Sequence, residues 1–168
     1  MIKSETIKKL EDNKAFAVVR EKNPQKVINI AKAIIDGGIK TIEITTDCSD
    51  ICKAVYELSN IDDTLIGAGS IITSQQALSG IQSGAKFLVT PVLEMSIVKF
   101  CKGRGIPLIT GASTANEAYS SWKVDNSIIK IFPAKAMGGA EYIKDILKAM
   151  PFLKLMPASG IGIDDCID

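Results

Sequence analysis

The amino-acid sequence predicts an α/β fold in which parallel strands form a TIM-type (β/α)₈ barrel. In three places, GGIKTIEIT, SGAKFLVTP and RGIPLITG, a glycine closes a helical pattern just before a short apolar run. Glycine is the usual residue after a helix and an apolar run is typical of a buried strand, so each segment predicts helix, turn and strand. Strict alternation of these units indicates a parallel sheet with right-handed crossovers.

Seven strands and six amphipathic helices follow from this periodicity. The strands are expected at 15–20, 39–45, 64–69, 86–90, 106–110, 127–132 and 153–157. The helices are expected at 24–36, 48–59, 73–83, 94–103, 114–122 and 138–149. The third helix opens with a Thr-x-x-Gln capping box formed by Thr73 and Gln76.

An open, doubly wound sheet is the competing architecture. Such sheets commonly carry a glycine-rich phosphate turn after the first strand, and the segment VVREKNP has none. In TIEIT and IIKIF, polar residues that include Glu43 and Lys130 alternate with isoleucines. A barrel would place the polar set inward and the aliphatic set against the helices, so the sequence favours the barrel.

The composition suits a single globular domain. Of 168 residues, 46% are hydrophobic and 23% charged, the net charge is +1, and no block of lysine or arginine occurs. This pattern argues against a nucleic-acid or membrane-surface partner, so any anion that the chain binds is expected to be small and held locally. No apolar run is long enough for a membrane span and the N-terminus is charged rather than signal-like, so we expect a cytoplasmic protein.

The metal-ligating residues are few. The chain has no histidine and four scattered cysteines, Cys48, Cys52, Cys101 and Cys166, so a zinc site would need all four. We therefore expect no metal, no cofactor and no disulfide framework. Without histidine, acid–base catalysis must rest on Lys, Glu, Asp, Tyr or Cys.

Two ionisable residues lie inside predicted strands. Lys130 is in the C-terminal part of its strand, which is the end where βα barrels build active sites. A lysine amine placed there could attack a carbonyl carbon, and Glu43 could take and return the protons of such a reaction. A buried structural ion pair is the alternative for both residues.

Other candidates lie where strands end. Arg20 ends the first predicted strand, and its guanidinium suits a carboxylate, although a solvent-facing arginine is equally compatible with the position. Gly67, Gly69 and Ser70 would let a small ligand approach backbone N–H groups, or would serve only the shape of the turn. Pro91 has the same two interpretations.

Five segments resemble one known family. GGIKTIEIT, IGAGS, SGAKFLVTP, IPLITGAST and IKIFPAKAMGG are similar, in order and at the right spacing, to segments of the 2-keto-3-deoxy-6-phosphogluconate (KDPG) and 4-hydroxy-2-oxoglutarate (KHG) aldolases. The resemblance covers essentially the whole chain. It implies a class I aldolase, a lyase of carbohydrate metabolism in the Entner–Doudoroff route that works as a homotrimer without a cofactor. Its reaction would give pyruvate and an aldehyde.

The resemblance also implies roles for individual residues. Lys130 would form the Schiff base and Glu43 would be the general acid and base. Arg20 and Ser70 would hold the pyruvyl carboxylate. The remaining expected contacts are Pro91 and Phe132 against the pyruvyl group, and Ser159 and Gly160 in the phosphate loop.

The sequence departs from the family at three places. Asp47 stands where many members have an arginine that contacts the substrate, so Arg20 would have to do that work alone. Ser159 replaces a glycine of the phosphate loop, which predicts weaker phosphate binding. The chain stops after the seventh strand, so we expect residues 1–168 to form one barrel domain that is C-terminally truncated relative to the family.

Two other functions stay open on the sequence. One is an inactive barrel fragment that needs a complementing segment, since a barrel without its eighth strand cannot close. The other is a metal-independent barrel lyase or isomerase of the phosphosugar type. Within the aldolase hypothesis, both the phosphorylated sugar acid and 4-hydroxy-2-oxoglutarate are candidate substrates.

Overall fold

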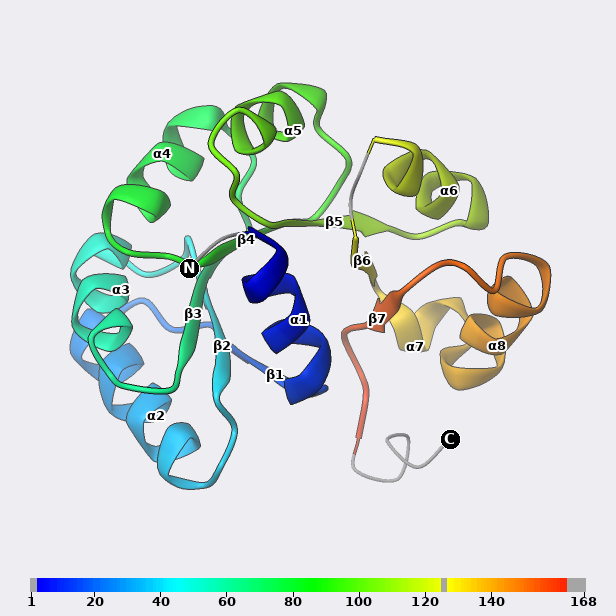
Figure 1. Cartoon of the computed structure of the whole chain (residues 1–168). Coiled ribbons are helices and arrows are strands. Elements are labelled where there is room, and N and C mark those ends of the chain that lie inside the picture. The colour runs from blue at the N-terminus through cyan, green and yellow to red at the C-terminus, as the bar shows by residue number, and fades with distance from the viewer. Residues whose placement is uncertain (1–2, 125–126, 163–168) are drawn as a thin grey trace. The chain divides into compact units, whose positions relative to one another are not determined.

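A computed structural model describes residues 3–124 and 127–162 of the chain (Figure 1). Strands and helices alternate along it. The strands are β1 (Phe16–Val19), β2 (Thr41–Thr45), β3 (Leu65–Gly69), β4 (Phe87–Thr90), β5 (Leu108–Ala112), β6 (Ile129–Ile131) and β7 (Leu155–Pro157). The helices are α1 (Lys3–Asn13), α2 (Pro24–Asp36), α3 (Ile51–Ser59), α4 (Ser74–Gln82), α5 (Met95–Lys102), α6 (Ala115–Lys123), α7 (Ala134–Met137) and α8 (Gly139–Ala149).

The strand order β1 to β7 follows the chain, and the registered strand pairs are parallel. All seven predicted strands and all six predicted helices are therefore present, with ends that differ by a few residues. The predicted α/β class and the parallel sheet are confirmed. Helix α3 starts later than expected because the side chain of Asp50 caps it by accepting a hydrogen bond from the N–H of Lys53.

The chain divides into two compact units. The N-terminal unit, residues 1–90 and 95–108, holds β1 to β4 and helices α1 to α5. The C-terminal unit, residues 91–94 and 109–168, holds nearly all of β5, together with β6, β7 and helices α6 to α8. The expectation of one barrel domain over residues 1–168 stays a prediction.

In the N-terminal unit, helices α2 to α5 lie side by side along one side of the strands (Figure 1). All five residues of β2 are buried. Side chains alternate along a strand, so Ile42 and Ile44 point to one face while Thr41, Glu43 and Thr45 point to the other. A strand buried on both faces is typical of a parallel sheet in an α/β fold.

The C-terminal unit has its own apolar core around β6. Its buried members are Ala112, Ala118, Ile129, Ile131, Ala134, Ile146 and Leu153. The two isoleucines in this core flank Lys130 in the sequence. The alternation of the strand therefore turns the lysine side chain to the opposite face, as the sequence pattern predicted.

Helix α1 was not expected from the sequence, in which this segment was noted only for its many charged residues. Thr6 and Leu10, one helical turn apart, are buried, and the helix ends where Asn13 Nδ2 donates a hydrogen bond to Thr41 Oγ1 at 2.9 Å. This bond places the end of α1 beside the first residue of β2. A helix with two buried residues gives only a weak periodic signal, which is why the pattern was missed.

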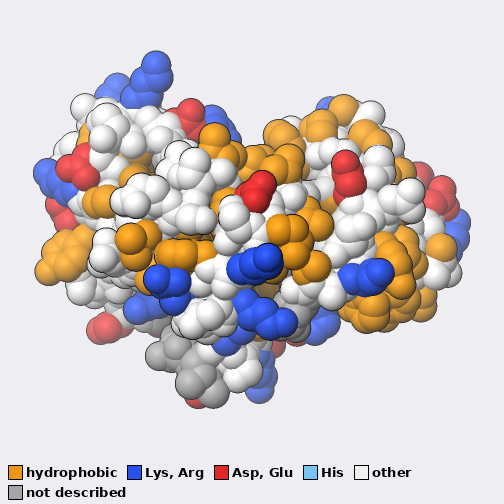
Figure 2. All heavy atoms as spheres, turned by 90° about the horizontal axis from the view of Figure 1, so that it is seen from above, with side chains coloured by type: hydrophobic (Ala, Val, Ile, Leu, Met, Phe, Trp, Pro, Cys, Tyr) orange, Lys and Arg blue, Asp and Glu red, His pale blue; other side chains and the backbone are white. Residues whose placement is uncertain are grey.

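The surface combines basic, acidic and apolar side chains on the face that Figure 2 shows. Within the C-terminal unit, the exposed rings of Tyr119, Trp122 and Phe152 form a cluster, with centroids 5.9 Å and 4.6 Å apart in successive pairs. None of the described helices is long and apolar enough to cross a membrane. The described residues also contain no group of three or more potential metal ligands, and Cys48, Cys52 and Cys101 are free thiols.

Two helices begin with a capping box. The predicted box of Thr73 and Gln76 is present at α4, and Thr114 and Glu117 form a second box at α6. Hydrogen bonds from the backbone N–H groups of Ser113 and Thr114 hold the pKa of Glu117 below its ordinary value. The ionised Glu117 carboxylate is therefore more stable in the folded chain than in the unfolded chain.

Replacing Glu117 by Gln should lower the free energy of unfolding at pH 7 by about 0.5 kcal/mol, because the amide keeps the box but loses the charge at the helix N-terminus. A lowered carboxyl pKa contributes stability above the unfolded pKa and loses it as the pH falls through the folded pKa. The difference between wild type and variant in urea unfolding should thus shrink in acid. Gln76→Glu, the reciprocal change, should introduce the same pH dependence at α4.

Candidate active site

Glu43 lies in the middle of β2 and is fully buried. Its register neighbours are Val18 in β1 and Gly67 in β3. Gly67 leaves the space that the Phe87 ring fills, and a Cβ on Gly69 would overlap the Glu43 carboxylate. The two glycines of IGAGS therefore serve packing around the acid, since they leave room for a long polar side chain and a large ring inside the sheet.

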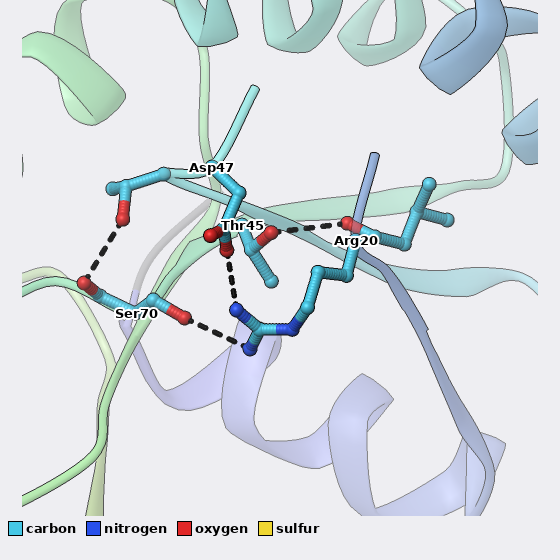
Figure 3. Close-up of polar contacts among 6 residues, drawn as sticks. Arg20, Thr45, Asp47 and Ser70 are labelled. Carbon is cyan, nitrogen blue, oxygen red and sulfur yellow. Dashed lines mark hydrogen bonds and ion pairs between the residues drawn. The ribbon is translucent and has the colours of Figure 1, made fainter. Parts of the chain in front are cut away.

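Arg20, Asp47 and Ser70 meet just beyond the ends of β1, β2 and β3 (Figure 3). Arg20 Nη1 pairs with Asp47 Oδ2, and Arg20 Nη2 donates a hydrogen bond to Ser70 Oγ at 3.3 Å. The structure thus brings together Arg20 and Ser70, which the sequence had assigned to one site. The ion pair with Asp47 was missed, because the sequence showed only that a carboxylate follows the second strand.

Polar side chains also tie these three strand ends to one another (Figure 3). Thr45 Oγ1 donates to the backbone oxygen of Val19 at 3.4 Å, and Thr46 Oγ1 donates to the backbone oxygen of Ser70 at 3.1 Å. Ser70 has a left-handed backbone, with φ of 60°. The Ser70 backbone is held by the hydrogen bond from Thr46.

Lys130 lies in β6 with only 9% of its surface exposed. Its register neighbours are Gly111 in β5 and Met156 in β7. A Cβ on Gly111 would overlap the backbone oxygen of Pro91, so the glycine lets the Pro91 backbone lie directly against β5. The Lys130 amine is 5.8 Å from the centroid of the Phe132 ring. The C-terminal unit therefore brings Lys130 and Phe132 together and sets Pro91 against the strand beside Lys130.

Phe132 is 40% exposed, and its backbone is held at both ends. Its N–H donates to the Ala112 oxygen at 3.0 Å, and its own oxygen accepts from Ser113 Oγ at 2.8 Å. Tyr142 Oη in turn donates to the Ser113 oxygen at 2.9 Å. Ser113 and Tyr142 were missed by the sequence reasoning, because their hydrogen bonds go to distant backbone oxygens, which no local pattern predicts.

Ser159 and Gly160 are exposed and follow β7, with left-handed φ values of 77° and 74°. The oxygen of Ser159 accepts a hydrogen bond from the N–H of Lys135 at 3.2 Å. A Cβ on Gly160 would come within 2.6 Å of the Lys135 Cβ. Ser159 therefore has the backbone conformation that glycine adopts most readily, at the position where it replaces a glycine of the expected phosphate loop.

The model of the KDPG and KHG aldolase family matches residues 6–168. The chain belongs to this family. A 2-dehydro-3-deoxy-phosphogluconate aldolase from Haemophilus influenzae is 32% identical over 163 residues, which cover 96% of this chain and 77% of that protein. The resemblance seen in the five sequence segments is thus confirmed.

Solved structures of KDPG aldolases have the same fold. One is the enzyme of Legionella pneumophila with pyruvate captured as a covalent carbinolamine, which is 30% identical, has a TM-score of 0.82, and is matched over 89% of this chain and 73% of its own. A 4-hydroxy-2-oxoglutarate/KDPG aldolase from TTHB1 has a TM-score of 0.84 at 23% identity, over 94% of this chain and 78% of its own. This second likeness concerns the fold alone.

Family membership supports the predicted enzyme class, a lyase of the Schiff-base aldolase type. The matches favour neither a complementation-dependent fragment nor a phosphosugar-type lyase or isomerase. Membership of the KDPG and KHG aldolase family also supports the prediction that the partner is a small-molecule substrate.

Gly69→Ala should destabilise the chain and displace Glu43, because the new methyl group would overlap the buried carboxylate. Overpacking of this kind typically costs about 1–3 kcal/mol. Gly103→Ala is a suitable control, since a Cβ there would meet its nearest neighbour at an ordinary 3.5 Å. Urea unfolding measures both variants, and equal free energies of unfolding for the two would contradict the packing role of Gly69.

Proposed function

We propose that this chain is a class I aldolase that cleaves a 2-keto-4-hydroxy acid to pyruvate and an aldehyde. The observation that carries the proposal is a lysine, Lys130, buried in β6 of a chain that belongs to the KDPG and KHG aldolase family. A family member 30% identical to the chain holds pyruvate as a covalent carbinolamine. Carbinolamine formation requires an amine, which Lys130 offers.

Lys130 supplies the electron sink in the proposed mechanism. Its neutral amine attacks the keto carbon of the substrate to form a carbinolamine, and loss of water gives a protonated imine. The C3–C4 bond then breaks as the C4 hydroxyl loses its proton, which releases the aldehyde and leaves an enamine on the lysine. Protonation of the enamine at C3 and hydrolysis of the imine release pyruvate and restore the amine. The imine accepts the electrons, so this route needs no cofactor.

Glu43 is the proposed general acid and base. The route requires protons to be delivered to the carbinolamine hydroxyl and removed from the C4 hydroxyl, and one carboxyl group can alternate between these tasks. The buried position of Glu43 and the space that Gly69 leaves for its carboxylate support this role. No histidine competes for it in the sequence.

The substrate carboxylate is proposed to bind Arg20 and Ser70. Both lie beyond strand ends, and a guanidinium can hold a carboxylate through two parallel hydrogen bonds. Phe132 and Pro91 are the proposed apolar contacts of the pyruvyl group. In support, the Phe132 ring lies near the Lys130 amine and is exposed on one side.

The preferred substrate in this proposal is KDPG, with 4-hydroxy-2-oxoglutarate as the second substrate. Ser159 and Gly160 would hold the phosphate through the loop after β7, and the serine supports weaker phosphate binding than two glycines would give. The Haemophilus influenzae relative is named for the phosphorylated substrate, whereas one from Escherichia coli, 29% identical, is named KHG/KDPG aldolase.

The cellular location and the assembly of the enzyme are also proposed. We place it in the cytoplasm, in the Entner–Doudoroff route, because a phosphorylated sugar acid is too strongly charged to cross a membrane unaided. A homotrimer is the proposed assembly, on the resemblance to the family. Light scattering coupled to gel filtration measures the subunit number directly.

Lys130→Ala should abolish covalent trapping. Incubation of the wild-type chain with pyruvate and borohydride should add a pyruvyl-derived mass to Lys130, located by peptide mass spectrometry, and Lys130→Ala should gain none. Lys148→Ala is the matched control, because Lys148 is exposed on α8 and pairs only with Asp145 among the contacts described. Labelling of other lysines with Lys130 unmodified would refute the assignment.

Glu43→Gln should lower kcat about 10²- to 10⁴-fold, which is the usual range for loss of a general acid–base group. Pyruvate should still become trapped on Lys130 after long incubation, because the amine itself is intact. Glu57→Gln, on α3, removes a carboxylate outside the strands and should leave kcat unchanged. A near-normal kcat in a folded Glu43→Gln chain would exclude the proposed role.

A further inference from the structure

The Arg20 guanidinium already has two partners inside the chain (Figure 3). One Nη atom pairs with the Asp47 carboxylate and the other donates to Ser70 Oγ. The side chains of Arg20 and Asp47 are 58% and 42% exposed, so this pair lies at the surface of the N-terminal unit. Its loss should leave the core untouched.

Asp47 is chemically the same kind of partner that a substrate carboxylate would be. A carboxylate ligand binds arginine best through two parallel N–H groups, and Asp47 occupies one of the terminal nitrogens. From this geometry, and resting on the proposed function of Arg20, we infer that Asp47 is a specificity-determining residue that competes with the substrate carboxylate for the Arg20 guanidinium. Asp47 would also repel the bound carboxylate, since the two groups carry like charges.

The alternative is that Asp47 orients Arg20 for the substrate. The contacts favour competition. Ser70 Oγ accepts a hydrogen bond from the second Nη atom, and the Ser70 backbone is held by the hydrogen bond that its carbonyl oxygen accepts from Thr46 Oγ1. Removing the charge of Asp47 therefore leaves Arg20 one anchor. Exposed ion pairs contribute little free energy, so the competition changes affinity only about two- to fivefold.

The competition also sets selectivity. Arg20 keeps a carboxylate partner when the ligand has none, so the wild-type site loses little when it accepts a neutral keto compound. Without the Asp47 charge, the guanidinium would gain more from a ligand carboxylate. Asp47→Asn should therefore raise the preference for pyruvate over its neutral methyl ester, again by about two- to fivefold.

Asp47→Asn and Asp50→Asn form a matched pair for the test. Both remove one negative charge between β2 and α3, and asparagine at position 50 keeps the cap of α3. The pyruvate concentration that gives half-maximal borohydride trapping should fall about two- to fivefold in Asp47→Asn, while the trapping rate at saturating pyruvate stays the same. Asp50→Asn should match wild type. An unchanged or higher half-saturating concentration in Asp47→Asn would overturn the inference.

Failure of the proposed function would look different. In that case wild type and both variants would trap no pyruvate at any concentration. The inference is then judged by the reaction of Arg20 with phenylglyoxal, read from peptide masses. Faster modification of Arg20 in Asp47→Asn than in Asp50→Asn would show that Asp47 occupies the guanidinium, and equal rates in the two would overturn it.

Discussion

Burial of both faces of strands β2 to β6 is the constraint on which the structure depends. Side chains alternate along a strand, so every second residue must go to the helix-covered face and be apolar. Ile42 and Ile44 in β2, and Ile129 and Ile131 in β6, meet this demand. The remaining positions are then free to carry polar groups, and Glu43 and Lys130 occupy them.

Close packing beside the buried ionisable residues requires glycine. Gly67 and Gly111 are the register neighbours of Glu43 and Lys130. At these positions a side chain would collide with Phe87 or with the Pro91 backbone, and at Gly69 it would collide with Glu43 itself. The glycines of the strands therefore act through packing around the ionisable residues, while those between helix and strand, such as Gly38 and Gly84, serve the left-handed turn.

The strand ends follow a different rule, because they are exposed and are stabilised by polar contacts. Arg20, Asp47 and Ser70 follow three consecutive strands and contact one another at the surface. Forming or losing such an exposed ion pair changes the free energy of unfolding only slightly. We therefore expect a substitution there to leave the fold intact. This freedom explains how a member of an aldolase family can carry an aspartate where an arginine is common and still keep its strand framework.

The sequence alone determined the seven strands, six of the described helices and the chemical candidates. Apolar periodicity located the seven strands, and the spacing of Thr73 and Gln76 predicted their capping box. The alternation around Lys130 predicted the face to which its side chain points. Each of these signals is local, because a turn of helix or a pair of strand residues encodes it within a few positions.

Only the tertiary structure decided which residues meet. Asp47 pairs with Arg20 across 27 positions of sequence, Ser70 meets Arg20 across 50, and Asn13 reaches Thr41 across 28. Such contacts depend on the register of neighbouring strands and on where a helix docks, which no local pattern specifies. Sequence periodicity therefore located Arg20 and Ser70 at strand ends. Strand register decided that the Asp47 carboxylate would pair with the Arg20 guanidinium.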